Sequence, residues 1–230
     1  MTGLNKSLAL KTKQLVKKRK CRGIKMKTEL KLPFDKEFVS SFSKNNNEPE
    51  WLTELRLKAL AEVETLPMPR PDKTKISKWN FTQFEKHTVE STGLSSLHAL
   101  SDNVKGLVDV DAENKNLYIQ QNQTPAFLSL SKELSDKGVI FTDIFTAARE
   151  HSDLLEKYFM TQGVKTSEHR LTALHAALLN AGAFSYVPKN VEMIEPIQAV
   201  YLHDDAATNL FNHVLIVADE NSSVTYVENY

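Results

Sequence analysis

Histidines beside acidic residues are the side chains of this sequence best suited to bind a metal. His203 is followed directly by Asp204 and Asp205, and His213 comes ten positions later. Imidazole and carboxylate groups are both competent metal ligands. Adjacent aspartates are also ordinary turn residues, and this spacing matches no specific ligand pattern. We therefore assign no metal-binding residue here.

Two other groups of histidines favour structural roles. His169 and His175 are six positions apart, so on a helix they would face different sides. His151, with Glu150 and Asp153 close by, is typical of a solvated helix face rather than of an acid–base pair. Neither group predicts catalysis.

Cys21 is the only cysteine, so the chain can form no internal disulfide and no zinc or iron–sulfur site from its own thiolates alone. That usage fits a reducing cytoplasm. Lys20 and Arg22 would lower the pKa of the Cys21 thiol and make it reactive. Reactivity without a neighbouring base or ordered surroundings does not amount to a function.

The sequence also contains no GxxxxGK[ST], GxSxG or HExxH motif. It therefore gives no support to a P-loop nucleotidase, a serine hydrolase or a zincin-type metalloprotease. We predict no catalytic, cofactor-binding or metal-binding residues, and we expect a protein that binds partners rather than a self-contained enzyme.

Helices are predicted over much of the first 182 residues, where apolar positions recur every three or four residues. Proline and glycine mark expected helix ends, for example Pro67 and Gly182. Thr124 followed by Pro125 has the signature of a helix start. The expected helices lie within residues 33–47, where the polar loop 45–47 follows the helix, and at 51–66, 124–134, 142–160 and 167–181.

Short strands are predicted in two regions. Gly106–Val110 and Leu117–Gln121 would form a small β element among the helices, and from Phe184 onward β-rich runs replace the helical spacing. Polar turn-forming segments separate these later runs, which suits either a β-sandwich or a stacked β-solenoid, and the spacing alone does not choose between them. The later strands are expected at Phe184–Val187, Ile197–Leu202, Val214–Val217 and Val224–Val227.

The predicted organisation is an α+β chain in three parts. Residues 1–25 hold nine lysines and arginines and no acidic residue, and are expected to be a basic, disordered extension, with Met26 as an alternative translation start. Residues 26–182 are expected to form a mainly helical domain, and residues 183–230 the start of a β core. The longest apolar run, Val214–Ala218, is too short to cross a membrane, so we expect a soluble, cytoplasmic protein.

Three blocks of the sequence resemble the SufB/SufD family of iron–sulfur cluster assembly proteins. The first is LNAGAFSYVPKNVEMIEP at Leu179–Pro196, with its glycine-containing turn, its aromatic residues, the YVPK segment and the later proline. The second, HVLIVADENSSVTYVENY at His213–Tyr230, is similar to the next part of the same fold, and Glu48–Phe81 is similar to a family N-terminal helix and linker. The likeness covers roughly Lys27–Tyr230 and leaves residues 1–25 unmatched.

The resemblance implies a helical N-terminal domain followed, at residues 183–230, by the first rungs of a right-handed parallel β-helix. It also implies a non-catalytic scaffold subunit that works with SufB and with the ATPase SufC, and a cluster that is held transiently at the level of the complex. Family members continue well past Tyr230, and the residues implicated in cluster assembly and in docking SufC lie in that continuation. We therefore carry over no site residue and expect a truncated, marginally stable scaffold.

Two other functions compete with this interpretation. A carbohydrate-active β-helix enzyme would need clustered carboxylates on one face, whereas Asp204, Asp205 and Asp219 are few and typical of turns. A nucleic-acid-binding module could use the basic residues 1–25, and its affinity would then fall steeply with salt. We expect SufB and SufC as partners ahead of nucleic acid, and we expect no membrane partner.

Overall fold

The computed structural model of the chain describes residues 32–81, 83–85, 87, 97–100, 102–108 and 116–230. Its helices are α2 (Lys36–Asn45), α3 (Glu50–Thr65), α4 (Asp102–Lys105), α5 (Lys132–Asp136), α6 (Ile144–Glu150), α7 (Ser152–Tyr158) and α8 (Arg170–Leu178), with 3-10 turns at Ile76–Lys78 and Leu97–Ala99. Its strands are β1 (Leu117–Gln121), β2 (Thr124–Ser129), β3 (Ile140–Asp143), β4 (Ala181–Val187), β5 (Ile197–Leu202), β6 (Asn212–Ala218) and β7 (Tyr226–Asn229). The predictions for residues 1–25, Cys21 and Met26 lie outside the described residues.

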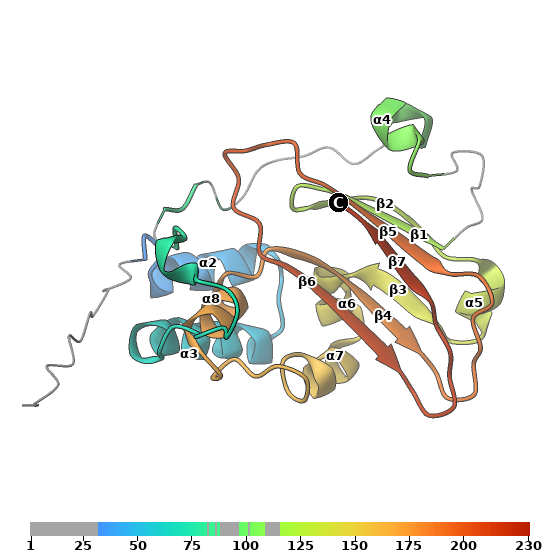
Figure 1. Cartoon of the computed structure of the whole chain (residues 1–230). Coiled ribbons are helices and arrows are strands. Elements are labelled where there is room, and N and C mark those ends of the chain that lie inside the picture. The colour runs from blue at the N-terminus through green and yellow to red at the C-terminus, as the bar shows by residue number, and fades with distance from the viewer. Residues whose placement is uncertain (1–31, 82, 86, 88–96, 101, 109–115) are drawn as a thin grey trace, which may run out of the picture.

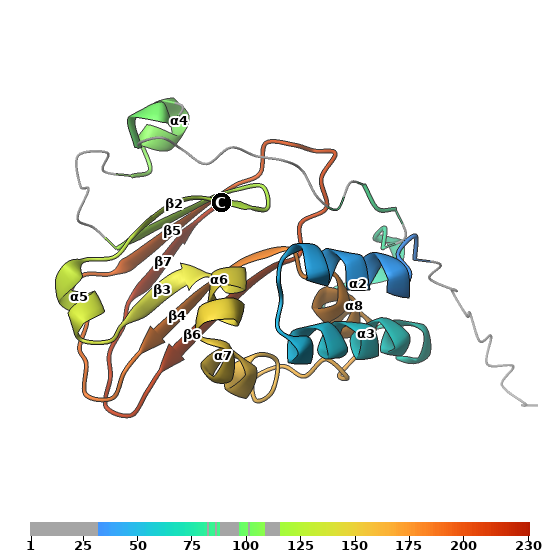
Figure 2. The ribbon, with the colours of Figure 1, turned by 180° about the vertical axis from the view of Figure 1, so that it is seen from behind.

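A layer of helices stands beside two sheets. Figures 1 and 2 show α2, α3 and α8 gathered at one end, while the strands run side by side at the other. Helices α6 and α7 bury Ile144 and Leu155 against Phe184 and Val217 of the β3–β4–β6 sheet. The α+β class is therefore confirmed. No helix in the described ranges has the length and apolar character needed to cross a bilayer.

The helical layer follows from capping and from small side chains. Helix α2 begins after Asp35, whose Oδ1 accepts a hydrogen bond from the backbone N–H of Phe38 at 2.8 Å. Val39 of α2, Val63 of α3 and Ala177 of α8 belong to one buried cluster. Because the buried residues of α8 include several alanines, α8 can pack closely on α3. The predicted helices at 33–47 and 51–66 are confirmed as α2 and α3.

A fully buried ion pair fastens the turn between α2 and α3. The side chains of Arg56 and Glu48 are both 0% exposed, and Arg56 Nη2 and Nε each lie 2.7 Å from a Glu48 carboxylate oxygen. Arg56 Nη1 donates to the backbone oxygen of Ala177 at 3.2 Å, and the guanidinium carbon lies 5.2 Å from the centre of the Phe42 ring. This one side chain therefore connects α2, α3 and α8.

The two sheets have the strand orders β2–β1–β5–β7 and β3–β4–β6. Strand β4 pairs in parallel with β6, and β5 pairs in parallel with β7. From β4 onward, the chain therefore passes through both sheets twice. We call β4 and β5 the first coil, and β6 and β7 the second coil. Each β4 residue pairs with the residue 31 positions later, from Ala181 with Asn212 to Val187 with Ala218.

Strands from the middle of the chain complete both sheets. Strand β1 runs parallel to β5 and antiparallel to β2, and β3 runs antiparallel to β4. The core between the sheets therefore draws on β1, β3, β4 and β5, whereas Ala126 of β2 belongs to a separate cluster. The buried members of the core include Tyr118, Phe141, Ala183, Val187, Ile197, Ala199 and Tyr201. A domain boundary at residue 182 stays a prediction, although strands from both sides of it pair within each sheet.

The helix predicted from Thr124 and Pro125 is wrong, because these residues begin strand β2. Strand β2 lies at the edge of its sheet, and Pro125 pairs with Gln120 at a register shift in the ladder. A proline lacks a backbone N–H, and at an edge strand the missing donor costs little. The helix that follows is the short α5, which ends just before Gly138, where φ is +82°.

Two other predicted helices are shorter than expected. The stretch 142–160 contains two helices, α6 and α7, because the backbone of His151 leaves the helical region with φ −130° and ψ 40°. Helix α8 begins at Arg170 and ends at Leu178, so Gly182 is not its cap and instead lies inside β4.

Four of the six strand predictions hold, one is displaced and one is wrong in the described residues. Residues 106–108 of the predicted Gly106–Val110 strand form a turn and a bend after α4, and its last two residues lie outside the described ranges. Val224–Val227 is displaced, since β7 begins at Tyr226. The predictions that agree are Leu117–Gln121 for β1, Phe184–Val187 within β4, Ile197–Leu202 for β5 and Val214–Val217 within β6.

Candidate interaction surface

The turns that leave β4 and β6 stack on one another. Lys189 forms an ion pair with Glu220 across the two coils, and Asn221 Nδ2 donates to Asn190 Oδ1 at 2.9 Å. Both asparagines have positive φ, 62° and 54°, a left-handed conformation that asparagine adopts more readily than most residues. The lysine of YVPK and the asparagine after it therefore hold one coil in register on the next.

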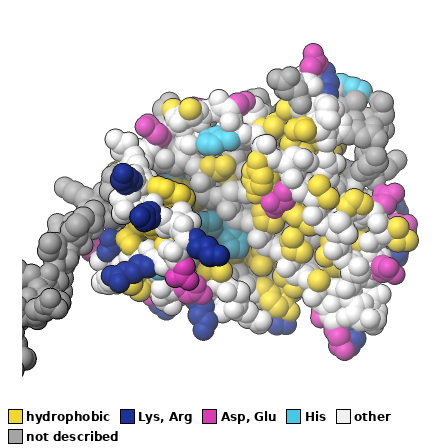
Figure 3. Space-filling view, in the orientation of Figure 1, with side chains coloured by type: hydrophobic (Ala, Val, Ile, Leu, Met, Phe, Trp, Pro, Cys, Tyr) yellow, Lys and Arg dark blue, Asp and Glu magenta, His cyan; other side chains and the backbone are white. Residues whose placement is uncertain are grey.

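The second coil leaves one edge of each of its strands open. Within the described part of the chain, β6 pairs only with β4, and β7 pairs only with β5. Ile216 is 38% exposed, Val227 41% and Tyr230 82%, whereas Val187 and Val200 of the first coil are fully buried. We call β6, β7 and Tyr230 the open edge. Figure 3 shows apolar side chains gathered on the sheet side of this face, and unpaired strand edges are templates for further pairing.

Tyrosines line the open edge. The hydroxyl groups of Tyr201 and Tyr226 lie 2.9 Å apart, and the rings of Tyr201 and Tyr230 stack with their centres 5.2 Å apart. Burial raises the pKa of Tyr201 and of Tyr226 far above the ordinary value, and it raises the pKa of Tyr230 to about 12 with help from Glu228. These hydroxyl groups are neutral at physiological pH, and they are used within the chain, because Tyr201 and Tyr226 share one hydrogen bond and Tyr230 donates to Glu228 Oε2 at 2.8 Å.

A histidine pair joins the helical layer to the second coil. His175 Nε2 of α8 lies 3.0 Å from Nδ1 of His213 at the start of β6, and the ring of Phe159 packs on His213 with centres 4.7 Å apart. Burial lowers the pKa of both histidines to about 4, and the charge of Arg56 contributes at His175. Both rings are therefore neutral at pH 7, and one donates its N–H to the other.

The structure divides the residues that the sequence grouped as metal candidates, which are His203, Asp204, Asp205 and His213. The Asp204 carboxylate accepts hydrogen bonds from the side-chain amides of residues 121 and 122, and Asp205 Oδ1 accepts from the backbone N–H of Ala207. The contacts of Asp204 join the β5–β6 loop to the β1–β2 turn. His213 is hydrogen-bonded instead to His175 of helix α8. Across the described ranges, no three His, Cys, Asp or Glu side chains converge as a metal site requires.

Two other histidines, His151 and His169, lie at helix ends. His169 caps α8, because its Nδ1 accepts a hydrogen bond from the backbone N–H of Thr172 at 3.2 Å. His151 stands between α6 and α7, and the nearby Glu150 and Asp153 are exposed, which agrees with a solvated helix face. These positions give no catalytic arrangement among the described residues.

Sequence reasoning missed two buried contacts, the His175–His213 pair and the Arg56–Glu48 ion pair. The first left little signal in the sequence, because VPKNVE and ADENSS, which the 31-residue offset of the strand pairing aligns, share only the asparagine. No periodicity predicts that α8 packs at this point. The ion pair left no signal, since charged residues at this spacing are usually exposed.

The comparisons with known proteins agree with one another. A family model described as the SufBD protein N-terminal region matches residues 36–199. The chain is 66% identical over 200 residues to the iron–sulfur cluster assembly protein SufD of Bacillus subtilis, which covers 87% of the chain and 46% of that protein. It is 34% identical to iron–sulfur cluster assembly SufBD family proteins of Staphylococcus saprophyticus and Staphylococcus haemolyticus, each covering 83% of the chain. The chain spans less than half the length of these relatives.

Proposed function

The chain belongs to the SufB/SufD family, and on that premise we propose that it is a scaffold component in iron–sulfur cluster assembly. The observation that carries this proposal is the 66% identity to a SufD protein over 87% of the chain. The chain then supplies binding surfaces, while ATP hydrolysis belongs to SufC. The cluster is cargo of the assembled complex in the cytoplasm and is not a resident cofactor of this chain.

We propose further that the two coils begin a right-handed parallel β-helix. The parallel pairing of β4 with β6 and of β5 with β7 supports this, as does the stacking of Asn190 on Asn221. In a solenoid each repeat buries its apolar residues on the next. The open edge is then the surface on which further structure stacks.

The proposed partners are SufB and SufC. Exposed strand edges and apolar side chains at Ile216 and Val227 suit a partner that extends the sheets. Because the Bacillus subtilis relative is more than twice as long as the matched segment, its other part is a second source of partner contacts. A test must therefore compare partner binding by this chain with partner binding by the full-length relative.

Co-expression of the tagged chain with SufB and SufC tests the proposal. We expect affinity capture to recover a complex of defined mass by light scattering. The positive control is the full-length Bacillus subtilis SufD in the same experiment. The scaffold proposal fails for this chain if the full-length relative captures SufB and SufC while the chain is recovered alone.

A matched pair of variants locates the contact. Val227→Lys places a charge on the open edge, and Val164→Lys makes the same change at a similarly exposed position, 48% against 41%, outside it. We expect V227K to reduce the captured SufB severalfold and V164K to leave it unchanged, because burying an unpaired charge is unfavourable. Equal capture by both variants would place the contact elsewhere.

A further inference from the structure

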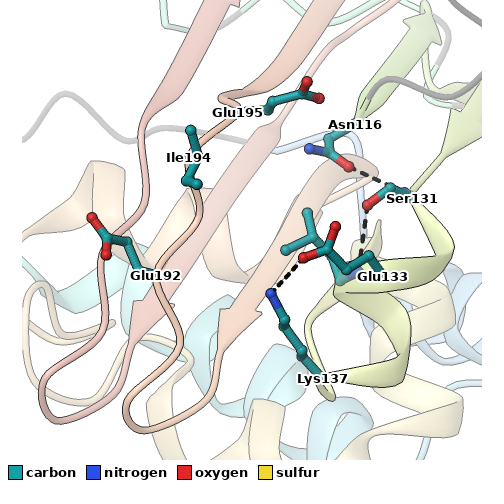
Figure 4. Close-up of a pocket in the computed structure, with 8 residues that line it drawn as sticks. Asn116, Ser131, Glu133, Lys137, Glu192, Ile194 and Glu195 are labelled. Carbon is teal, nitrogen blue, oxygen red and sulfur yellow. Dashed lines mark hydrogen bonds and ion pairs between the residues drawn. The ribbon is translucent and has the colours of Figure 1, made fainter.

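A polar cavity of about 220 Å³ opens between α5 and the turn that joins β4 to β5 (Figure 4). None of its lining residues belongs to β6, β7, Tyr230 or the histidine pair. Residues from three segments line it, namely Asn116 before β1, Ser131, Glu133, Leu134 and Lys137 at α5, and Glu192, Ile194 and Glu195 in the turn.

Asn116 brings an unused hydrogen-bond donor to this cavity. The residue is 1% exposed, its Oδ1 accepts from the backbone N–H of Ser131 at 3.1 Å, and its backbone oxygen accepts from Gln198 N at 2.8 Å. Its Nδ2 is buried and has no hydrogen-bond partner among the described residues. Figure 4 shows this nitrogen directed to the side of the cavity on which Glu195 and Ile194 lie. A buried donor without an acceptor is unfavourable, so an acceptor brought by a ligand would be stabilised there.

The charges around the cavity select the kind of ligand. Glu133 is paired with Lys137 at 2.7 Å, and this hydrogen bond lowers the pKa of Glu133. Glu192 and Glu195 both line the cavity and form no ion pair with any described residue. Figure 4 shows the Glu195 carboxylate on the side of Asn116 and the Glu192 carboxylate on the other side of the turn. The net charge at the opening is negative, which attracts cations and repels phosphates, nucleic acids and acidic lipids.

The lining also distinguishes among cations. A divalent metal needs several converging oxygen ligands, and in the described part of the chain no three acidic or histidine side chains converge in that way. Ile194 is 92% exposed at the rim, and the buried Leu134 contributes an apolar wall. The cavity therefore combines a hydrogen-bond donor, two unpaired carboxylates and an apolar rim, which together match an extended peptide.

We propose that this cavity binds an extended segment of a partner protein that carries lysine or arginine beside an apolar residue. A backbone carbonyl of the segment accepts the hydrogen bond from Asn116 Nδ2. Basic side chains of the segment lie against Glu195 on the side of Asn116 and against Glu192 on the other side of the turn, and the apolar side chain packs on Ile194 between them.

Fluorescence anisotropy with the full chain tests this proposal. The probe is a capped, labelled peptide of alternating lysine and leucine, and the matched probe has glutamate in place of lysine. The double variant E192Q/E195Q removes both carboxylates without changing side-chain size. The control E150Q/E156Q removes two exposed carboxylates on α6 and α7, away from the cavity.

We expect the lysine peptide to bind, with a Kd about tenfold higher for E192Q/E195Q and unchanged for E150Q/E156Q, which is the scale of two exposed ion pairs. The glutamate peptide should not bind. Equal affinity for both double variants, equal binding of the two peptides, or no binding of the lysine peptide would each overturn the proposal.

A second measurement follows Asn116 itself. In the nitrogen-15 NMR spectrum of the full chain, the Asn116 side-chain amide signals should shift on addition of the lysine peptide. Asn116→Asp keeps an acceptor for Ser131 and removes the donor, so it should weaken binding, with circular dichroism reporting whether the variant is folded. Unmoved Asn116 signals at saturating peptide would contradict the proposed contact.

Discussion

Gly182 lies where the two coils approach each other closely, opposite His213. Its φ of +150° lies in a region that other residues rarely adopt, and a Cβ added there would lie 1.9 Å from the backbone oxygen of His213. No flexible side chain can move to relieve that contact, because the neighbour is backbone. The glycine of the family-like block AGAFSYVPK is therefore required by the spacing of β4 and β6.

Gly182→Ala should lower the free energy of unfolding by about 3 kcal/mol or more, because it adds both backbone strain and a clash. Gly163→Ala is the matched control, since a Cβ there would meet nothing within 4 Å, and its effect should stay within about 0.5 kcal/mol. Urea unfolding followed by circular dichroism compares the two. Equal midpoints would contradict the close approach of β4 and β6.

The His175–His213 pair makes stability depend on pH. The pKa of each histidine is lowered to about 4 in the folded chain, against about 6.5 in the unfolded chain. The unfolded chain therefore binds more protons below pH 6.5, and stability should be lost as the pH falls from about 6.5 towards 4. His87, whose pKa is also about 4 because of burial, adds to this loss.

His213→Gln should therefore flatten the fall in unfolding free energy between pH 7 and pH 5, without abolishing it. The control is His203→Gln, which replaces an exposed histidine in the loop before β6 and should keep the slope of the parent chain. Urea midpoints at several pH values give the slopes. A slope for H213Q equal to that of the parent would show that the pair does not titrate with unfolding.

Between elements, the decisive contact is the Arg56–Glu48 ion pair that joins α2, α3 and α8. An unpaired charge in the interior is strongly unfavourable. Replacing one member of the pair should therefore destabilise the fold more than replacing both. Exposed pairs such as Lys132–Asp136, 2.8 Å apart on α5, contribute little by comparison. The helical layer thus depends on two side chains that no apolar pattern reveals.

Arg56→Met should lower the free energy of unfolding by about 3–5 kcal/mol, and the double variant E48Q/R56M should cost less than the sum of its single changes, because the two charges are coupled. Lys132→Met, which breaks an exposed pair, should change it by no more than about 0.5 kcal/mol. Chemical denaturation of E48Q, R56M and E48Q/R56M gives the coupling directly, with K132M as the exposed control. Additive effects in the double variant would contradict the buried pair.

Sequence reasoning predicted secondary structure better than it predicted contacts between distant segments. Helices α2 and α3 and strands β1, β4, β5 and β6 follow from apolar periodicity, which is a property of neighbouring residues. The Thr124–Pro125 signal failed because the same two residues suit an edge strand, and only the pairing of β2 with β1 distinguishes the two cases. The cavity at Asn116 was not predictable, because its lining comes from three separate segments.

At the scale of the whole molecule, the strands of the second coil run parallel to those of the first. Strands β4 and β6 run the same way, as do β5 and β7, so any segment that continues this pattern must add its strands in parallel. The chain itself adopts that order through the turns at Asn190 and Asn221. The stacking of one coil on the next therefore depends on contacts between the turns as well as on strand pairing.

The open edge also restricts how two copies of this chain could meet. A twofold axis perpendicular to the sheet that brings β6 of one copy beside β6 of another sets the strands antiparallel, the reverse of the polarity between β4 and β6. Self-association of this kind would pair the two β6 strands antiparallel. No further parallel coil could then be added at this edge. Strand direction alone separates a correct continuation from a dimer that blocks it.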